Sequence, residues 1–261
     1  MASPTANVPA AEDTHRGQAL YLDLMKRVLT NVIYRDAPVS WSGPGNDYDI
    51  AMRENGSDIP SVAHTMVGLA RLDNVQYCLE RVLAEDVPGD FIETGVWRGG
   101  VCIFARAILH AYGVTDRQVW VADSFAGIPR PQVDGHPLDR RLQLHRMNDV
   151  LAVPAETVAA NFERYGLLDE RVRFLKGWFR DSLPTAPVAR LAVLRLDGDL
   201  YESTMDALHS LYPRLSPGGF TIIDDYNIRA CREAVHEYRD RHGISEPLEQ
   251  IDLNAVYWRR A

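Results

Sequence analysis

The feature that most constrains the fold is an alternation of short apolar runs with longer segments of helical periodicity from Gly89 onward. Alternation of this kind predicts an α/β fold, with a mostly parallel Rossmann-like sheet and helices on both faces. Two final runs separated by little more than Asn254 predict a hairpin that adds an antiparallel edge, for seven strands in all. The expected strands are 91–95, 118–123, 172–176, 191–196, 220–223, 249–253 and 255–259, and the expected helices are 101–112, 203–212 and 231–241.

The N-terminal part of the chain has a different pattern. Residues 17–34 and 62–83 carry apolar residues at helical spacing, and residues 38–60 between them are rich in Gly, Pro, Asn and Asp. A loop of that length in a compact domain is often a functional lid. The 261 residues therefore divide into a disordered start (1–16), N-terminal helices with a lid loop (17–88) and a ligand-binding core (89–261).

Composition excludes several classes of protein. The net charge of −8 and the absence of a basic run argue against nucleic acid and against an anionic membrane surface. No apolar run approaches the roughly 20 residues that span a bilayer, and the first residues do not resemble a signal peptide. The three cysteines form no CxxC pair, which is typical of reduced thiols. We expect a soluble, cytoplasmic protein.

Ligands of open parallel sheets bind beyond the carboxyl ends of the strands, near the point where the strand order reverses. After the first strand, Glu93-Thr94-Gly95-Val96-Trp97-Arg98-Gly99-Gly100 forms a glycine-rich turn without the GxGxxG spacing of a dinucleotide site. An acid at Glu93 fits the positively charged amino group of a methionine tail better than a pyrophosphate. Asp123, at the end of the second strand, fits ribose hydroxyls, which S-adenosylmethionine and NAD share. The combination favours S-adenosylmethionine, and Trp178 is either an adenine contact or a core aromatic residue.

Asp197, Asp199, Asp224 and Asp225 follow two strands that we expect to be neighbours. Carboxylates gathered there would repel one another unless a cation or shared protons relieved the repulsion. Oxygen ligands of this type suit Mg²⁺, and the spacing of His236 and His242 does not fit a zinc site. Purely structural or helix-capping roles for the aspartates are the alternative. A metal would lower the pKa of a bound sugar hydroxyl, and Asp199 is the candidate general base.

Four segments together resemble the macrocin-type (TylF/MycF-like) O-methyltransferases, a family of Rossmann-like class I methyltransferases that act on deoxysugars of antibiotics. They are the glycine-rich turn at 93–100, Trp120-Val121-Ala122-Asp123-Ser124-Phe125, Arg195-Leu196-Asp197-Gly198-Asp199 and Ile223-Asp224-Asp225-Tyr226. The resemblance runs from about Tyr21 to Arg260.

The resemblance implies roles for particular residues. Asp197, Asp224 and Asp225 would bind Mg²⁺, Asp199 would be the base, and the segment around His64 to Met66 would close over the cofactor. Residues 38–60 and 129–148 would shape the sugar pocket. Tyr48, His64, His136 and His145 are candidate substrate contacts, of which Tyr48, His136 and His145 fit surface or packing roles better. The cofactor contacts would be Thr65, Met66, Glu93, Thr94, Gly95, Gly99, Asp123, Ser124, Gly177 and Trp178.

The implied acceptor is a sugar hydroxyl of a glycosylated antibiotic precursor. The 4-hydroxyl of noviose in a novobiocin-type aminocoumarin is the specific expectation, and a macrolide deoxysugar of the macrocin or mycinamicin type is the alternative. Monomer and homodimer both remain open.

Two other classes of protein remain as rivals. A nicotinamide-dependent oxidoreductase does not explain why Asp197, Asp224 and Asp225 would be clustered. A non-catalytic binding module does not explain why a candidate general base, Asp199, would lie beside them. A hydrolase is disfavoured because the chain has no GxSxG elbow.

Overall fold

A seven-stranded sheet forms the centre of the protein, which the computed structural model describes over residues 11–39 and 47–261. Its strand order is β3-β2-β1-β4-β5-β7-β6. The five strands from β3 to β5 are parallel, while β7 pairs antiparallel with both β5 and β6. The predicted Rossmann-like sheet with an antiparallel C-terminal edge is thus confirmed. The strands are β1 (Asp90–Thr94), β2 (Val119–Asp123), β3 (Val172–Lys176), β4 (Leu191–Leu196), β5 (Leu215–Ile223), β6 (Glu249–Gln250) and β7 (Val256–Arg259).

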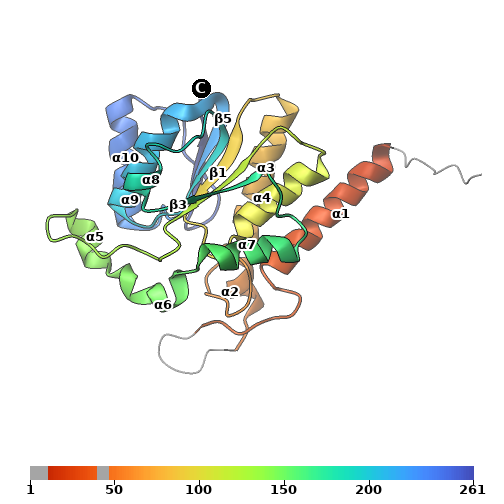
Figure 1. Ribbon diagram of the computed structural model, residues 1–261, viewed down its shortest axis with the longest axis horizontal. Helices are drawn as coiled ribbons and strands as arrows, with labels where there is room; N and C mark the ends of the chain where they lie inside the picture. Colours follow the sequence, from red (N-terminus) through yellow and green to blue (C-terminus); the bar gives the residue numbers. More distant parts are fainter. Residues whose placement is uncertain (1–10, 40–46) are drawn as a thin grey trace, which may run out of the picture.

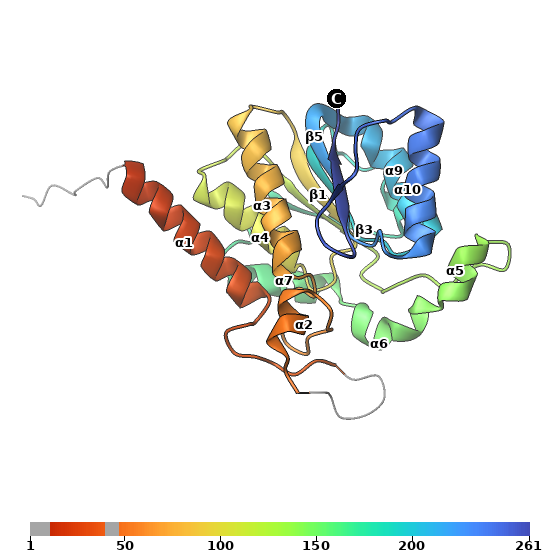
Figure 2. The ribbon, with the colours of Figure 1, turned by 180° about the vertical axis from the view of Figure 1, so that it is seen from behind.

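Helices cover both faces of the sheet (Figures 1 and 2). Because successive side chains of a strand point to opposite faces, Phe91 and Ile92 of β1 belong to two separate cores. Phe91 packs in the core that includes residues of α1 (Ala11–Leu29), α3 (Leu69–Ala84), α4 (Gly100–Ala111) and α7 (Ala155–Arg164). Ile92 packs in the core built with α9 (Tyr201–Leu211) and α10 (Arg229–His242), and α8 (Phe179–Ser182) lies on this side as well.

The N-terminal region differs in detail from the sequence prediction. Helix α1 begins at Ala11, so residues 11–16 are helical and not disordered, whereas residues 1–10 lie outside the described part. Within the expected lid loop, α2 (Ile50–Glu54) is a short helix capped by Asp49, and Pro38 pairs with Pro60 in an isolated β-bridge. Residues 40–46 of that loop are outside the described residues.

Two core regions also depart from the prediction. Strand β5 begins at Leu215, five residues before the expected start at residue 220. Its pairing with β4 changes register between Leu191 and Val193. Between β2 and β3 the chain forms elements that the periodicity did not indicate: α5 (Pro137–Leu142), the 3₁₀ turn η1 (Leu144–Met147), α6 (Asn148–Leu151) and α7. A further 3₁₀ turn, η2 (Tyr212–Arg214), precedes β5.

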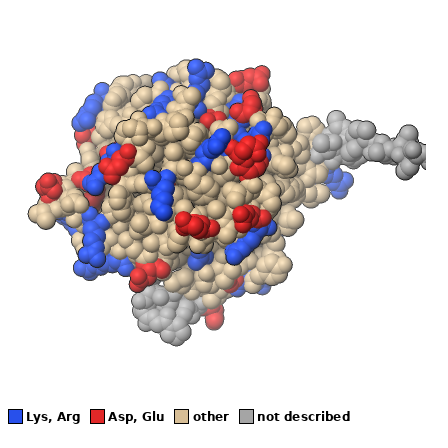
Figure 3. All heavy atoms as spheres, in the orientation of Figure 1, with Lys and Arg blue, Asp and Glu red and all other residues tan. Residues whose placement is uncertain are grey.

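On the face drawn in Figure 3, basic and acidic side chains are interspersed. No helix among the described residues is long and apolar enough to cross a bilayer. All three cysteines are buried free thiols, as expected.

Candidate active site

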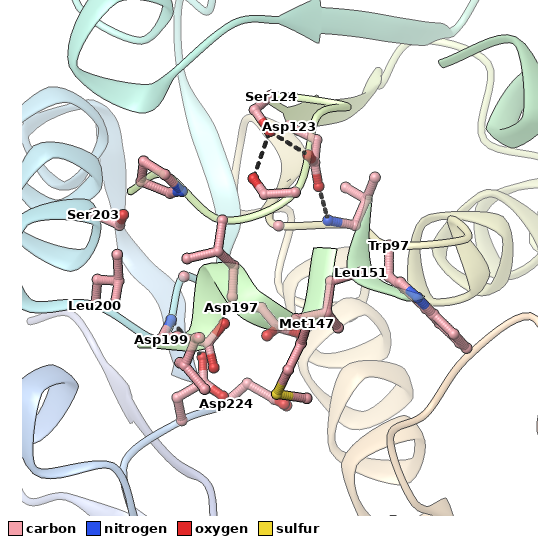
Figure 4. Close-up of a pocket in the computed structure, with 18 of the residues that line it drawn as sticks. Trp97, Asp123, Ser124, Met147, Leu151, Asp197, Asp199, Leu200, Ser203 and Asp224 are labelled. Atoms are coloured by element: carbon pink, nitrogen blue, oxygen red, sulfur yellow. Dashed lines mark hydrogen bonds between the residues drawn. The ribbon is translucent and has the colours of Figure 1, made fainter. Parts of the chain in front are cut away.

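A cavity of about 510 Å³ lies at the carboxyl ends of the strands. Figure 4 shows Asp197, Asp199 and Asp224 gathered on one side of it, with Asp123 and Ser124 on another. The structure therefore brings the expected metal end and cofactor end into a single pocket. The predicted site residues on its wall are Thr65, Met66, Glu93, Gly95, Asp123, Ser124, Trp178, Asp197, Asp199, Asp224 and Asp225.

Three predicted cofactor contacts lie behind this wall. Thr94 is fully buried at the end of β1. Gly99 is the N-cap residue of α4, with φ +85°. The N–H of Gly177 donates to the carbonyl of Asp123 over 2.9 Å, which joins the ends of β2 and β3. These residues shape the pocket through the backbone.

The four candidate substrate contacts are also absent from the wall. The Nδ1 atom of His64 lies 2.7 Å from the hydroxyl of Tyr165, and the ring of His136 stacks on that of Tyr201 with centroids 3.7 Å apart. Tyr48 lies over the guanidinium of Arg53. The contacts of His136 and Tyr48 are of the kind expected from the surface or packing alternative. His145 is half-buried in η1.

The acidic cluster arises because β4 and β5 are neighbours in register, with Leu196 paired to Ile223. One carboxylate oxygen from each of Asp197, Asp224 and Asp225 can be chosen so that all three lie within 4.8 Å of one another. Such a set of hard oxygen donors fits Mg²⁺, which binds through a few carboxylates and leaves other positions for water or substrate. The donor set therefore suits the metal expected from the sequence.

Two buried arginines balance part of the negative charge. Arg195, on β4, has no exposed surface, and its guanidinium pairs with Glu93, Asp197 and Asp224. Arg71, on α3, donates from Nη1 to Oδ2 of Asp224 over 2.7 Å. Among the described residues, Asp225 takes part in no ion pair, which leaves its carboxylate for a cation.

Asp199 lies directly beside this cluster. Its backbone is left-handed, with φ +56°, a conformation that costs energy in a non-glycine residue and often marks a functional site. The conformation is held by a hydrogen bond from the N–H of Asp199 to Oδ2 of Asp225 over 2.9 Å. Burial, followed by the charges of Asp197 and Asp224, raises the pKa of Asp199 to about 7.

The glycines of the cofactor turn are required mainly by the protein's own packing. A Cβ on Gly95, whose φ is +87°, would lie 1.7 Å from the carbonyl oxygen of Asp197, and a Cβ on Gly100 would lie 2.4 Å from that of His64. Gly95 thus lets the turn after β1 pack against the turn after β4. The glycine-rich pattern alone did not indicate this contact between the two turns.

The two acids of the cofactor end have different surroundings. Glu93 is almost fully buried between Arg195 and the thiol of Cys102, and burial is the main reason that its pKa is raised to about 7. Asp123 accepts hydrogen bonds from the N–H groups of Val96 and Phe125 over 2.8 and 2.7 Å. Asp123 therefore fixes the cofactor turn and also faces the cavity.

An apolar wall was not predicted from the sequence. Trp97 lines the cavity together with Met147 and Leu151 of η1 and α6 (Figure 4). The indole N–H of Trp97 donates to the carbonyl of Val150 over 3.0 Å, which joins the cofactor turn to the segment after β2. The short helices of that segment are not preceded by any clear hydrophobic periodicity, so no sequence pattern indicated this wall.

Comparison with known proteins places the chain in a family. The family model described as macrocin O-methyltransferase (TylF) matches residues 18–260. A Streptomyces olivaceus protein named 8-demethyl-8-(2,3-dimethoxy-alpha-L-rhamnosyl)-tetracenomycin-C 4'-O-methyltransferase is 65% identical over 246 residues, which cover 94% of this chain and 94% of that protein.

Two further relatives are similar over nearly their whole length. Mycinamicin III 3''-O-methyltransferase of Micromonospora griseorubida is 59% identical over 94% of this chain and 98% of its own. Demethyldecarbamoylnovobiocin O-methyltransferase of Streptomyces niveus is 52% identical over 97% and 98%. The solved structure of the O-methyltransferase NovP superimposes with a TM-score of 0.90 at 53% identity, and the match covers 94% of this chain and 99% of that structure.

Proposed function

The chain belongs to the macrocin O-methyltransferase (TylF) family, and from that membership we propose that it methylates a sugar hydroxyl of a glycosylated antibiotic intermediate with S-adenosylmethionine and Mg²⁺. The observation that carries the metal dependence is the convergence of Asp197, Asp224 and Asp225 beside Asp199 in the cavity that also holds Asp123. Neither a nicotinamide-dependent oxidoreductase nor a non-catalytic module accounts for that arrangement.

The residues divide the work between two sides of the cavity. Asp123, Ser124, Thr65, Met66 and Trp178 would hold the cofactor, and the three clustered aspartates would hold Mg²⁺. When bound, the metal lowers the pKa of a sugar hydroxyl and orients it, and S-adenosylmethionine supplies an activated methyl group. Asp199 accepts the hydroxyl proton, while the pocket wall aligns the oxygen with the methyl carbon and excludes water.

Arg195 has a supporting part in this scheme. Its guanidinium contacts Glu93 on the cofactor side and Asp197 and Asp224 on the metal side. Because a buried arginine holds carboxylates at fixed positions, Arg195 keeps the two halves of the site at a constant separation. An acceptor with two neighbouring oxygens fits the metal best, which favours a vicinal diol of the sugar.

The identity of the sugar is a finer proposal. The noviose 4-hydroxyl, expected from the sequence, stays a prediction, as does the macrolide alternative. Identity with the novobiocin-type relative is 52%, compared with 65% for the tetracenomycin-type relative. The 4'-hydroxyl of the dimethoxyrhamnosyl tetracenomycin is therefore the first acceptor to test.

The test is mass spectrometry of the purified enzyme with S-adenosylmethionine and one of three desmethyl acceptors: the tetracenomycin, mycinamicin or aminocoumarin glycoside. Each reaction is run with Mg²⁺ and with EDTA. We expect a gain of one methyl group only in the presence of Mg²⁺, with the greatest kcat/KM identifying the acceptor class.

Methylation at an equal rate in EDTA would remove the metal role from the proposal but keep the transfer reaction. No methylation of any of the three glycosides, by enzyme that still binds S-adenosylhomocysteine, would contradict the proposed acceptor class.

A further inference from the structure

The start of α9 is capped by a carboxylate from a distant segment. Leu200 is the N-cap residue of α9, and its side chain makes no capping hydrogen bond. Asp139 of α5 takes that role: Oδ1 accepts from the N–H of Tyr201 over 2.7 Å, and Oδ2 accepts from the N–H of Glu202 over 3.0 Å. Only 3% of Asp139 is exposed. A buried carboxylate at a helix N-terminus satisfies free N–H groups and interacts favourably with the helix dipole.

The segment that carries Asp139 is the acceptor loop, which we define as residues 124–151. A second contact attaches it to the same helix end, because His136 stacks on Tyr201 and the N–H of His136 donates to Oε1 of Glu202 over 2.8 Å. At its base the loop is closed by Asn148, whose side chain accepts from the N–H of Ile128 over 2.9 Å and donates to its carbonyl over 3.0 Å. The loop is thus fastened at its base and at its tip.

The helix end that Asp139 caps is continuous with the metal-side turn. Residues 197–200 link β4 to α9, and in this turn Asp197 is held by a 2.9 Å hydrogen bond from its N–H to the carbonyl of Thr94. Asp199, in its left-handed conformation, stands between that anchor and the capped helix end. The position of its carboxylate therefore depends on both ends of the turn.

We propose that Asp139 is a positioning residue that sets the place of Asp199 and couples it to the acceptor loop. Asp139 faces the cavity, as do Pro129, Met147 and Leu151 of the same loop. A sugar that contacts this loop is therefore connected, through Asp139, to the start of α9 and to the turn that carries Asp199. This inference rests on the proposed function, in which Asp199 is the base. Neither the sequence motifs nor the family comparison assigns a role to Asp139.

A cap that only stabilises the fold is the competing explanation, and the chain offers a matched control. Asp90 also accepts two hydrogen bonds, from the N–H of Gln118 and the indole N–H of Trp120, each over 2.8 Å. It begins β1 and so lies at the opposite edge of the sheet from the cavity. Asp90→Ala therefore removes the same kind of carboxylate without touching the site.

The experiment compares Asp139→Ala, Asp139→Asn and Asp90→Ala with the wild type. For each protein, hydrogen exchange is followed by mass spectrometry over residues 197–205, S-adenosylhomocysteine affinity by calorimetry, and kcat with the tetracenomycin glycoside. We expect Asp139→Ala to exchange faster in that peptide and to lose about 10-fold or more in kcat, since misplacement of a reacting group by about 1 Å can cost up to about 100-fold. Cofactor affinity should stay within about twofold of the wild type. Asp139→Asn, which keeps one accepting oxygen, should recover part of kcat.

Unchanged kcat in folded Asp139→Ala, or an equal loss in Asp90→Ala, would overturn the positioning role. If Asp139→Ala does not fold, Asp139→Asn provides the test. The positioning role would then be overturned by a kcat and a hydrogen-exchange rate in Asp139→Asn that both equal those of the wild type. Asp199→Asn separates the two proposals. Full activity of that variant would show that Asp199 is not the base, whereas the exchange rates would still decide whether Asp139 holds the turn.

Discussion

Single residues of the site depend on partners far away in the sequence. Arg195 carries its charge in the interior only because Glu93, Asp197 and Asp224 surround it, and the first of these lies 102 positions away. Loss of one member of a buried ion pair leaves an uncompensated charge, which typically costs about 3–5 kcal/mol. At Arg195, only a substitution that keeps the positive charge can test its role without leaving buried carboxylates unpaired. Asp199 forms no ion pair among the described residues, so the neutral substitution Asp199→Asn can test its role.

Asp199→Asn should retain cofactor binding and lose most turnover. The amide has the shape of the carboxylate but does not accept a proton, and general bases typically contribute about 10²-fold to 10⁴-fold to the rate. The measurements are kcat and S-adenosylhomocysteine affinity, with Asp181→Asn on the exposed side of α8 as the control. An equal loss of cofactor affinity would count against a base role.

At the scale of elements, the segment that contains α2 is held by a buried arginine. Arg53, 1% exposed, donates to Asp36 and Asp58 and to the carbonyl of Thr30. Oδ2 of Asp36 in turn accepts from the N–H of Val62 over 2.6 Å. These contacts fasten both ends of the expected lid to the end of α1, so this part of the lid forms a fixed wall.

The Asp36 contribution should depend on pH. Burial alone would raise its pKa, but hydrogen bonds from Val62, Arg53 and Asn31 outweigh burial and lower the pKa to about 2. In the unfolded chain the pKa of an aspartate is about 3.9. The charged Asp36 therefore makes its full contribution to stability above about pH 3.9, and that contribution is lost as the pH falls through about 2. Urea unfolding should show that the stability difference between wild type and Asp36→Asn narrows by about 1 kcal/mol from pH 6 to pH 3. A difference that stays constant would contradict the lowered pKa.

At the scale of the whole molecule, one side chain joins three regions. Arg71 of α3 donates to Asp224 in the aspartate cluster, to Asp252 before β7 over 2.8 Å and weakly to the carbonyl of Gly56 after α2. Asp252 also accepts from the N–H groups of Asn254 and Ala255, which shapes the C-terminal hairpin. Ligands that bind at the cluster should therefore stabilise the molecule as a unit.

Thermal unfolding measures this linkage. S-adenosylhomocysteine at about 100 times its Kd should add about 2.7 kcal/mol of stability and raise Tm by roughly 5–10 °C. Mg²⁺ should raise Tm further in the wild type and in Asp181→Asn, and much less in Asp225→Asn, which removes one ligand without breaking an ion pair. An equal Mg²⁺ effect in Asp225→Asn would remove Asp225 from the ligand set.

Much of this arrangement could be predicted from the sequence because its signals are local. The predicted bounds of β3 and β4 agree with the structure. A short apolar run that is followed by glycine or aspartate is typical of a buried strand. Acids placed after neighbouring strands meet at one sheet edge, so the strand pattern predicted that Asp197, Asp199, Asp224 and Asp225 gather there. The choice of Asp197, Asp224 and Asp225 as the ligand set came from the family resemblance.

The rest depends on contacts that no local pattern encodes. Arg71 and Asp224 are 153 positions apart, and Asp139 caps a helix 62 positions away through backbone N–H groups that carry no sequence signal. The helices α5 and α6 are too short for a periodicity to show. The histidines singled out in this region, His136 and His145, therefore could not be placed before the loop itself was known.

The hydrogen bonds that hold the acceptor loop determine how easily this loop could be exchanged between related enzymes. Asn148 closes the loop on its own main chain, and Asp139 grips the main chain of α9, so neither anchor requires a particular side chain from the rest of the enzyme. The other contacts of residues 124–151 do need particular side chains, namely Trp97, Tyr201 and Glu202. A chimera that takes residues 124–151 from a relative therefore brings Asn148 and Asp139 with it, and three positions in the rest of the chain decide whether the new loop is held in place.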